Sequence, residues 1–207
     1  MNTLQRIMCS LLLAALAGCA SMHSNKPIVT LSPNGSDILY NGELDASAIA
    51  QVQTIYAQAT VKPTRLVINS HGGSSNLGMA LGDFIHDKQL DIRVDGTCMS
   101  SCANYVFPAA RNKYLGERDA LLWPGGALQP DWEALIKAKW KHNPAQQDRA
   151  REDIRQWVIS EKAFFERIGV SQLITVCGQQ PEWIKAYPQA PGFYYSPEDM
   201  QRFGIHD

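Results

Sequence analysis

Two short segments of the chain carry residue types that could perform acyl chemistry. Gly72 and Gly73 follow an apolar run, and glycine allows backbone N–H groups to approach a ligand closely. Ser100 supplies a hydroxyl just before a predicted short helix, whose first N–H groups carry a partial positive charge. Together the two segments outline a nucleophile beside an oxyanion hole, whereas a glycine pair taken alone is better explained by a tight turn.

A serine hydroxyl is a weak nucleophile until a base removes its proton. His71, directly before the two glycines, is the first candidate for that base, and its alternative interpretation is a solvent-exposed loop histidine. Lys139, Lys141 and His142 lie near the expected junction of two helices and are the second candidates, weighed against being solvated helix charges.

The segments that must position these residues alternate between strand-like and helix-like patterns from Ile28 onward. That alternation is typical of an α/β fold with parallel strands. We expect strands at residues 38–40, 66–68, 92–94, 120–123 and 193–195. A sharp turn is expected over 96–101, so the glycine loop and the serine turn each follow a strand. Because ligand sites form at the carboxyl edge of parallel sheets, the two loops should lie close together.

Helix boundaries are marked by capping residues. Asp45 should cap a helix that carries Ile49 and Val52 on its apolar face, and a second helix should run through 77–85. Asn143 and Pro144 should begin a long helix with an apolar core stripe, which Gly169 ends. A last helix should start at Ser196 and end at Gly204.

The N-terminus predicts export. Arg6 precedes an apolar run over 7–16, which is the pattern of a secretory signal peptide and is too short to span a bilayer of about 30 Å. Residues 16–19, Leu-Ala-Gly-Cys, resemble the lipobox of bacterial lipoproteins, which implies cleavage before Cys19 and attachment of a diacylglycerol with palmitate-type acyl chains to its thiol. The alternative is an ordinary signal peptide in which Cys19 is incidental.

These features divide the chain into a signal peptide (1–18), a lipidated cysteine with a polar tether (19–27) and one domain (28–207). Ala20 after the cysteine resembles the sorting pattern of outer-membrane lipoproteins, so the domain would face the periplasm. The chain has 207 residues, 45% hydrophobic and 19% charged, which indicates a globular domain. A net charge of −1 provides no electrostatic footprint for nucleic acid.

The cysteines remaining after processing and acylation are Cys98, Cys102 and Cys177. An odd number in an oxidising compartment predicts one disulfide and one thiol. Cys98 can pair with Cys102 if the turn brings their Cα atoms to about 6 Å, and a bridge from either to Cys177 is the competing choice. We expect no metal site, because no second ligand pair accompanies Cys98 and Cys102, and no cofactor.

The two loops also resemble a known family. Residues 66–74, LVINSHGGS, look like the strand and glycine loop of the Clp protease proteolytic subunit and its crotonase-fold relatives, and 96–103, GTCMSSCA, align without a gap to that family's serine turn. The closing residues 196–207 are similar to its last helix and terminus. The likeness covers roughly 38–207, although 127–190 matches only in helical character.

This resemblance implies a spiral of βαβ units in which Ser100 is the nucleophile and the N–H groups of Gly73 and Ser101 form the oxyanion hole. It also implies a peptide or protein ligand and assembly into homo-oligomers. The chain departs from the family where a base histidine should stand, in the strand read here as 120–126, and where an orienting aspartate should stand, at 190–192.

Three function classes follow. The first is a serine peptidase or hydrolase outside the cytoplasm, which uses Ser100 and an unconventional base. The second is a catalytically inactive relative that binds a peptide or partner in the same place. The third, acyl-CoA chemistry of the crotonase kind, is disfavoured by the secretory signal, because CoA is a cytoplasmic cofactor.

Overall fold

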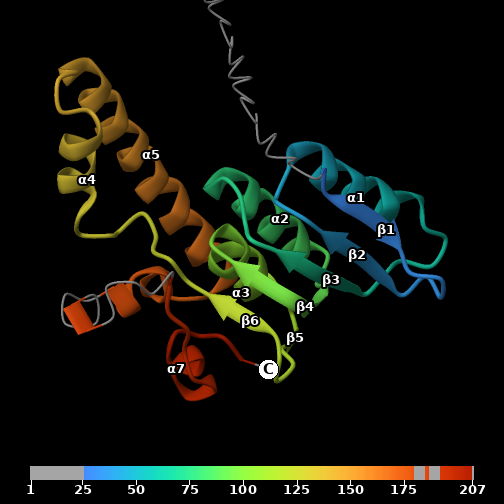
Figure 1. Cartoon of the computed structure of the whole chain (residues 1–207). Helices are drawn as coiled ribbons and strands as arrows, with labels where there is room; N and C mark the ends of the chain where they lie inside the picture. The colour runs from blue at the N-terminus through green and yellow to red at the C-terminus, as the bar shows by residue number, and fades with distance from the viewer. Residues whose placement is uncertain (1–25, 180–184, 187–191, 207) are drawn as a thin grey trace, which may run out of the picture.

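The computed structural model describes residues 26–179, 185–186 and 192–206. The predicted signal peptide, Cys19 and residues 190–191 lie outside this part of the chain. The molecule is a mixed α/β structure built on one sheet, shown in Figure 1. The strands are β1 (Ile28–Leu31), β2 (Asp37–Asn41), β3 (Arg65–Ser70), β4 (Asp91–Met99), β5 (Lys113–Tyr114) and β6 (Ala120–Leu122).

The strands run in the order β1-β2-β3-β4-β5. β4 pairs with β5 through residues 92–93 and with β6 through residues 97–99. From β2 to β6 all pairs are parallel, as the alternating pattern predicts, whereas β1 is antiparallel to β2. β1 and β5 were not expected from the sequence. Buried and partly exposed residues alternate along β2, so one face of the sheet packs against helices and the other is more open.

The helices come in the order the caps predict. They are α1 (Ala46–Gln58), α2 (Ser75–Asp87), the π-helical η1 (Cys102–Val106), α3 (Phe107–Ala109), α4 (Trp132–Lys139), α5 (Pro144–Ile168), the 3-10 turns η2 (Gln172–Thr175) and η3 (Cys177–Gln179), and α7 (Pro197–Arg202). The side chains of Asp45, Asn143 and Ser196 accept hydrogen bonds from the first N–H groups of their helices, and Gly169 ends α5 in the left-handed conformation.

Helices α1 and α2 lie on the same face of the sheet, and the end of α5 packs beside α2 (Figure 1). α4 and the first turns of α5 form an arm that projects from this body (Figure 1). Within the arm the rings of Trp132 and Trp157 meet edge to face, with centroids 5.7 Å apart, and Arg151 pairs with Glu133 at 2.9 Å. No helix among residues 26–179, 185–186 and 192–206 is long and apolar enough to cross a membrane.

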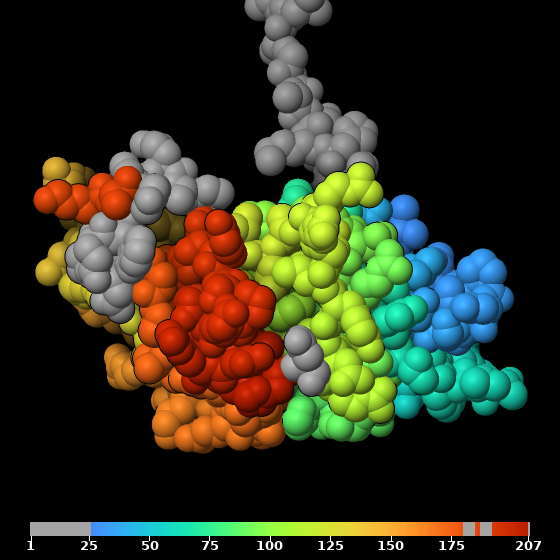
Figure 2. Space-filling view, turned by 90° about the horizontal axis from the view of Figure 1, so that it is seen from below, coloured from blue at the N-terminus to red at the C-terminus, as the bar shows by residue number. Residues whose placement is uncertain are grey.

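Two expectations about local structure were wrong. The turn predicted over 96–101 is shorter, because β4 continues to Met99 through an irregular stretch. The strand predicted over 193–195 is reduced to one antiparallel bridge, in which Phe193 exchanges two backbone hydrogen bonds with Trp123, of 2.9 and 3.0 Å. Figure 2 shows the C-terminal segment that contains α7 (red) beside the yellow-green residues that include β6.

The irregular stretch of β4 sets where the serine turn begins. Val94 pairs with Ile68 but Cys98 pairs with Ser70, so β4 has two more residues than β3 in this interval. Side chains from other elements satisfy the freed N–H groups: Asn69 accepts from Thr97 at 3.1 Å and Asp119 accepts from Gly96 at 2.9 Å. The bulge therefore places the end of β4 beside the glycine loop that follows β3.

Candidate functional site

Ser100 occupies the turn between β4 and η1 with strained backbone geometry. Its φ is +54°, in the left-handed region that non-glycine residues rarely adopt and that costs about 1–2 kcal/mol. Two hydrogen bonds hold it there, since its N–H donates to the Leu122 carbonyl at 3.1 Å and its carbonyl accepts from Asn104 N–H at 2.8 Å. Such strain persists where surrounding structure enforces it, and it clusters at functional sites.

A disulfide closes the same turn. Cys98 and Cys102 are bonded, with Cα atoms 5.3 Å apart, and neither residue has exposed surface. This is the first of the two pairings considered from the sequence. Cys177 is a free, half-buried thiol whose pKa is raised by burial. Ser100 is thus enclosed by a covalent loop of five residues.

The glycine loop lies directly against the serine turn. Gly72 has φ +96°, and a Cβ on it would come within 2.6 Å of the Met99 carbonyl oxygen and 2.8 Å of the Ser100 Cβ. Ser101 Oγ donates a 2.7 Å hydrogen bond to the Gly73 carbonyl. The structure therefore brings together the two segments that carry Ser100, Gly73 and Ser101, and only glycine fits at position 72.

The proposed oxyanion donors remain available. Gly72 N–H is used, because it donates to Ser70 Oγ at 3.1 Å. The N–H groups of Gly73 and Ser101, in contrast, have no acceptor within the described part of the chain. A Cβ on Gly72 would lie only 2.9 Å from Ser101 N, so Ser101 packs against the residue that directly precedes Gly73. Both N–H groups therefore belong to the two segments that meet beside Ser100, and free backbone N–H groups are the donors from which oxyanion holes are built.

No base accompanies the hydroxyl. Among the described residues, nothing forms a hydrogen bond with Ser100 Oγ, and His71 is exposed without a hydrogen bond or ion pair. Lys139, Lys141 and His142 are on the arm, where Lys139 lies over the ring of Trp140 at 4.5 Å. None of the sequence-derived base candidates therefore forms a hydrogen bond with Ser100.

The stretches where the Clp likeness expects a histidine and an aspartate, 120–126 and 190–192, meet beside the bridge between Trp123 and Phe193. Trp123 is fully buried with its ring 5.1 Å from that of Tyr195, and Gly192 is the residue of the second stretch that the structure describes. A Cβ on Gly192 would stand 2.9 Å from the Trp123 carbonyl oxygen, so the backbone leaves too little room for an aspartate side chain at that position. Trp123 Nε1 is buried without a partner in the described residues. An indole cannot accept a proton from serine.

A buried carboxyl, which the sequence analysis did not single out, lies behind the site. Glu161 on α5 has no exposed surface and accepts hydrogen bonds from Tyr105 Oη at 2.7 Å, from Gln172 Nε2 at 2.7 Å and from the N–H of Ala127. Desolvation raises the pKa of Glu161, against the effect of these hydrogen bonds. The sequence feature that could have identified Glu161 as buried is its position in the apolar stripe of α5, where Trp157 and Phe165 stand four residues away on either side.

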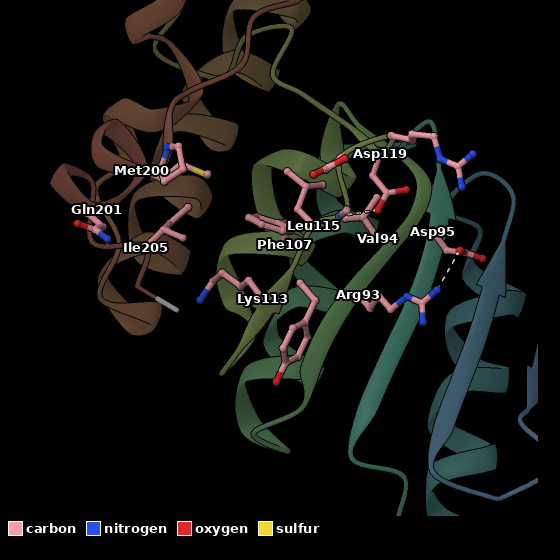
Figure 3. Close-up of a pocket in the computed structure, with 15 residues that line it drawn as sticks. Arg93, Val94, Asp95, Phe107, Lys113, Leu115, Asp119, Met200, Gln201 and Ile205 are labelled. Carbon is pink, nitrogen blue, oxygen red and sulfur yellow. Dashed lines mark hydrogen bonds and ion pairs between the residues drawn. The ribbon is translucent and has the colours of Figure 1, made fainter.

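A separate open pocket of about 1050 Å³ lies between the sheet and the C-terminal segment (Figure 3). Its lining comes from β4, β5, α7 and adjoining residues. It includes Phe107 of α3, Leu115 after β5, Met200 of α7 and Ile205 after α7, together with the ion pair of Arg93 with Asp95 at 3.3 Å. It includes neither Ser100 nor the glycine loop. No cluster of three potential metal ligands occurs in the part of the chain that the structure describes.

No protein-family model matches this chain, and a comparison with curated proteins found no significant match. The geometry around Ser100 is therefore the observation from which a function can be inferred.

Proposed function

We propose that this chain is a slow serine hydrolase of the Clp-like α/β spiral class, anchored by a lipid on Cys19 to the outer membrane and facing the periplasm. One observation carries the hydrolase assignment: Ser100 is held at φ +54° against Gly72, beside the open N–H groups of Gly73 and Ser101. The lipobox-like residues 16–19 carry the anchor.

The reaction supported by this geometry is acyl transfer to the Ser100 hydroxyl. Ser100 Oγ forms a bond to the carbonyl carbon of an ester while the bond from that carbon to the leaving oxygen breaks, and the serine proton reaches the leaving alkoxide through solvent. The N–H groups of Gly73 and Ser101 stabilise the negative oxygen of the tetrahedral intermediate. Water then hydrolyses the acyl-serine, which releases the acid and restores the hydroxyl.

A second candidate is a catalytically inactive module that binds a peptide or partner at the same place. The buried indole of Trp123 and the lack of room for a side chain at Gly192 favour it, because neither residue can act as a general base or orient one. General-base assistance contributes about 10² to 10⁴-fold to the rate. The two candidates differ in whether Ser100 forms a covalent bond.

A fluorophosphonate probe distinguishes them. The wild-type protein should be labelled slowly, Ser100→Ala should lose the labelling while it remains folded, and the exposed Ser160→Ala should be labelled like the wild type. Rapid stoichiometric labelling would demonstrate a base, with His71→Ala as the next variant. Binding of a peptide without labelling, lost in Gly73→Val, would establish the inactive module instead.

A further inference from the structure

The loop over residues 122–127 is tied to the serine turn by hydrogen bonds. The Leu122 carbonyl accepts from the N–H of Ser100 at 3.1 Å, and the Gly125 carbonyl accepts from Nδ2 of the Asn104 side chain at 2.8 Å. Asn104 is 3% exposed, and its own backbone N–H donates to the Ser100 carbonyl at 2.8 Å. Asn104 therefore connects Ser100 to this loop, so a change in the hydrogen bonds of Asn104 acts directly on the serine turn.

The same loop and η1 also meet at the buried carboxyl of Glu161. This carboxyl accepts from Tyr105 Oη of η1 at 2.7 Å and from the N–H of Ala127 at the end of the loop. From η2 it faces the neutral side chain of Gln172, and from its own helix Trp157 donates to Tyr105 Oη at 2.9 Å. Tyr105 is thus the titratable group against Glu161, and within the described part of the chain no charged side chain pairs with this carboxyl.

The two protonation states of Glu161 make opposite demands on Tyr105. An ionised carboxylate only accepts hydrogen bonds, and the Tyr105 hydroxyl donates one of them. A carboxylic acid must also donate, and because Gln172 and Ala127 contact Glu161 as donors, the acceptor that it meets is the Tyr105 oxygen. The Tyr105 hydroxyl then needs another acceptor for its own proton. Desolvation raises the pKa of Glu161 and so favours this protonated state.

Asn104 carries a candidate for that acceptor. Its Oδ1 is buried without a hydrogen-bond partner among the described residues, and an unsatisfied buried acceptor destabilises the native state. Burial and the neighbouring Glu161 raise the pKa of Tyr105, whereas hydrogen bonding from Trp157 and from the Asn104 side chain opposes the rise. The Asn104 amide is therefore a neighbour of the Tyr105 hydroxyl, and its unpartnered oxygen can accept the proton that Glu161 no longer accepts.

We propose that Glu161 is a positioning residue, whose protonation reverses the hydrogen bonds that join it to Tyr105 and Asn104 and so holds the serine turn more firmly at acidic pH. In the ionised state Tyr105 donates to Glu161. In the protonated state Glu161 donates to Tyr105 and Tyr105 donates to Asn104 Oδ1, while Nδ2 keeps its bond to Gly125. One proton enters from water, and no other covalent bond changes. Only the consequence for acylation of Ser100 rests on the proposed function.

Nuclear magnetic resonance of the whole protein tests the rearrangement. As the pH is lowered from about 9 to about 4.5, the amide resonances of Ser100 and of the Asn104 side chain should shift together, with a midpoint above the ordinary glutamate value of 4.5. Glu161→Gln has a donor and an acceptor, as the protonated acid does, so it should show the shifts of the acidic wild type at every pH. Glu166→Gln is the matched control, because Glu166 lies on the same helix with its side chain 64% exposed, and it should titrate like the wild type.

Tyr105→Phe separates the proposed chain of hydrogen bonds from a general effect of the buried charge. Without the hydroxyl, the step should persist at the N–H of Ala127, which contacts Glu161 directly, and should disappear at Ser100 and at the Asn104 side chain. A step caused by the exposed His71 would persist in every variant. A wild type that titrates like Glu161→Gln, or a Glu161-dependent step that Tyr105→Phe retains at Asn104, overturns the inference.

Labelling by the fluorophosphonate probe separates this inference from the proposed function. At about pH 9 the wild type should be labelled about two- to tenfold more slowly than Glu161→Gln, the range that one hydrogen bond predicts, and the two rates should converge as the pH falls. If no labelling occurs but the Glu161-dependent step is present, the hydrolase assignment fails and the rearrangement stands. If both proteins are labelled at a ratio that does not change with pH, the inference fails and the hydrolase assignment stands.

Discussion

Glu161 shows how a single buried side chain joins several elements around the site. Its carboxylate receives donors from η1 through Tyr105, from η2 through Gln172 and from the loop after β6 through Ala127. Trp157 Nε1 donates to the same Tyr105 hydroxyl at 2.9 Å, and burial beside Glu161 raises the pKa of Tyr105. Glu161 thereby holds the loop containing Gly125 over the helix that follows Ser100.

The raised pKa of Glu161 predicts an unusual pH dependence. The native state holds this proton more tightly than the unfolded chain, so ionisation of Glu161 costs stability above its native pKa and the cost disappears as the pH falls through that value. Relative to Glu161→Gln, the wild type should gain free energy of unfolding as the pH is lowered from the raised native pKa of Glu161 toward about 4.5, the value of an unperturbed glutamate. Urea unfolding of both proteins measures the difference, and a flat or opposite trend would contradict the assignment.

At the scale of elements, the contact between the glycine loop and the serine turn determines the site. Gly72→Ala combines left-handed strain with an overlap against the Met99 carbonyl, so unfolding free energy should fall by about 2–5 kcal/mol. Gly35→Ala is the matched control, because Gly35 has φ +72° with nothing within 4 Å of an added Cβ, and it should lose only about 1–2 kcal/mol. Equal losses in denaturant unfolding would argue against the contact.

The sequence predicted those parts of the helices and strands that depend on residues close together in the chain. The caps at Asp45, Asn143 and Ser196 are local hydrogen bonds, and each is found. The extension of β4 to Met99 escaped prediction because it depends on Asn69 and Asp119, which are 28 and 23 residues away from their N–H partners. Likewise, the only pairing of the segment 193–195 is the bridge of Phe193 to Trp123, a residue 70 positions earlier in the chain.

The site was predictable to a similar extent. The neighbourhood of Ser100, Gly73 and Ser101 follows from parallel strands ending at one edge. The hydrogen bonds to the carbonyls of residues 124–126 could not be predicted in this way. Their donors, Asn104, Gln179 and Trp132, reach these carbonyls only after distant segments pack together.

For the whole molecule, attachment to a membrane should depend on one thiol. Cys19→Ala removes the proposed lipidation site, so the variant should lose incorporation of labelled palmitate and should appear in the soluble fraction of the cell envelope. Cys177→Ala is the control, because it removes the free thiol of the described domain and should leave partitioning unchanged. Membrane association of the Cys19 variant would contradict the anchor.

The disulfide around Ser100 also constrains the order of events when the protein matures. Cys98 and Cys102 have no exposed surface in the folded chain, so an oxidant must reach both thiols before β4 and η1 pack into the core. Oxidation therefore belongs to folding and does not follow it. A chain that folds under reducing conditions would seal two thiols behind a closed core, and an uncrosslinked turn would then have to hold Ser100 in its left-handed conformation.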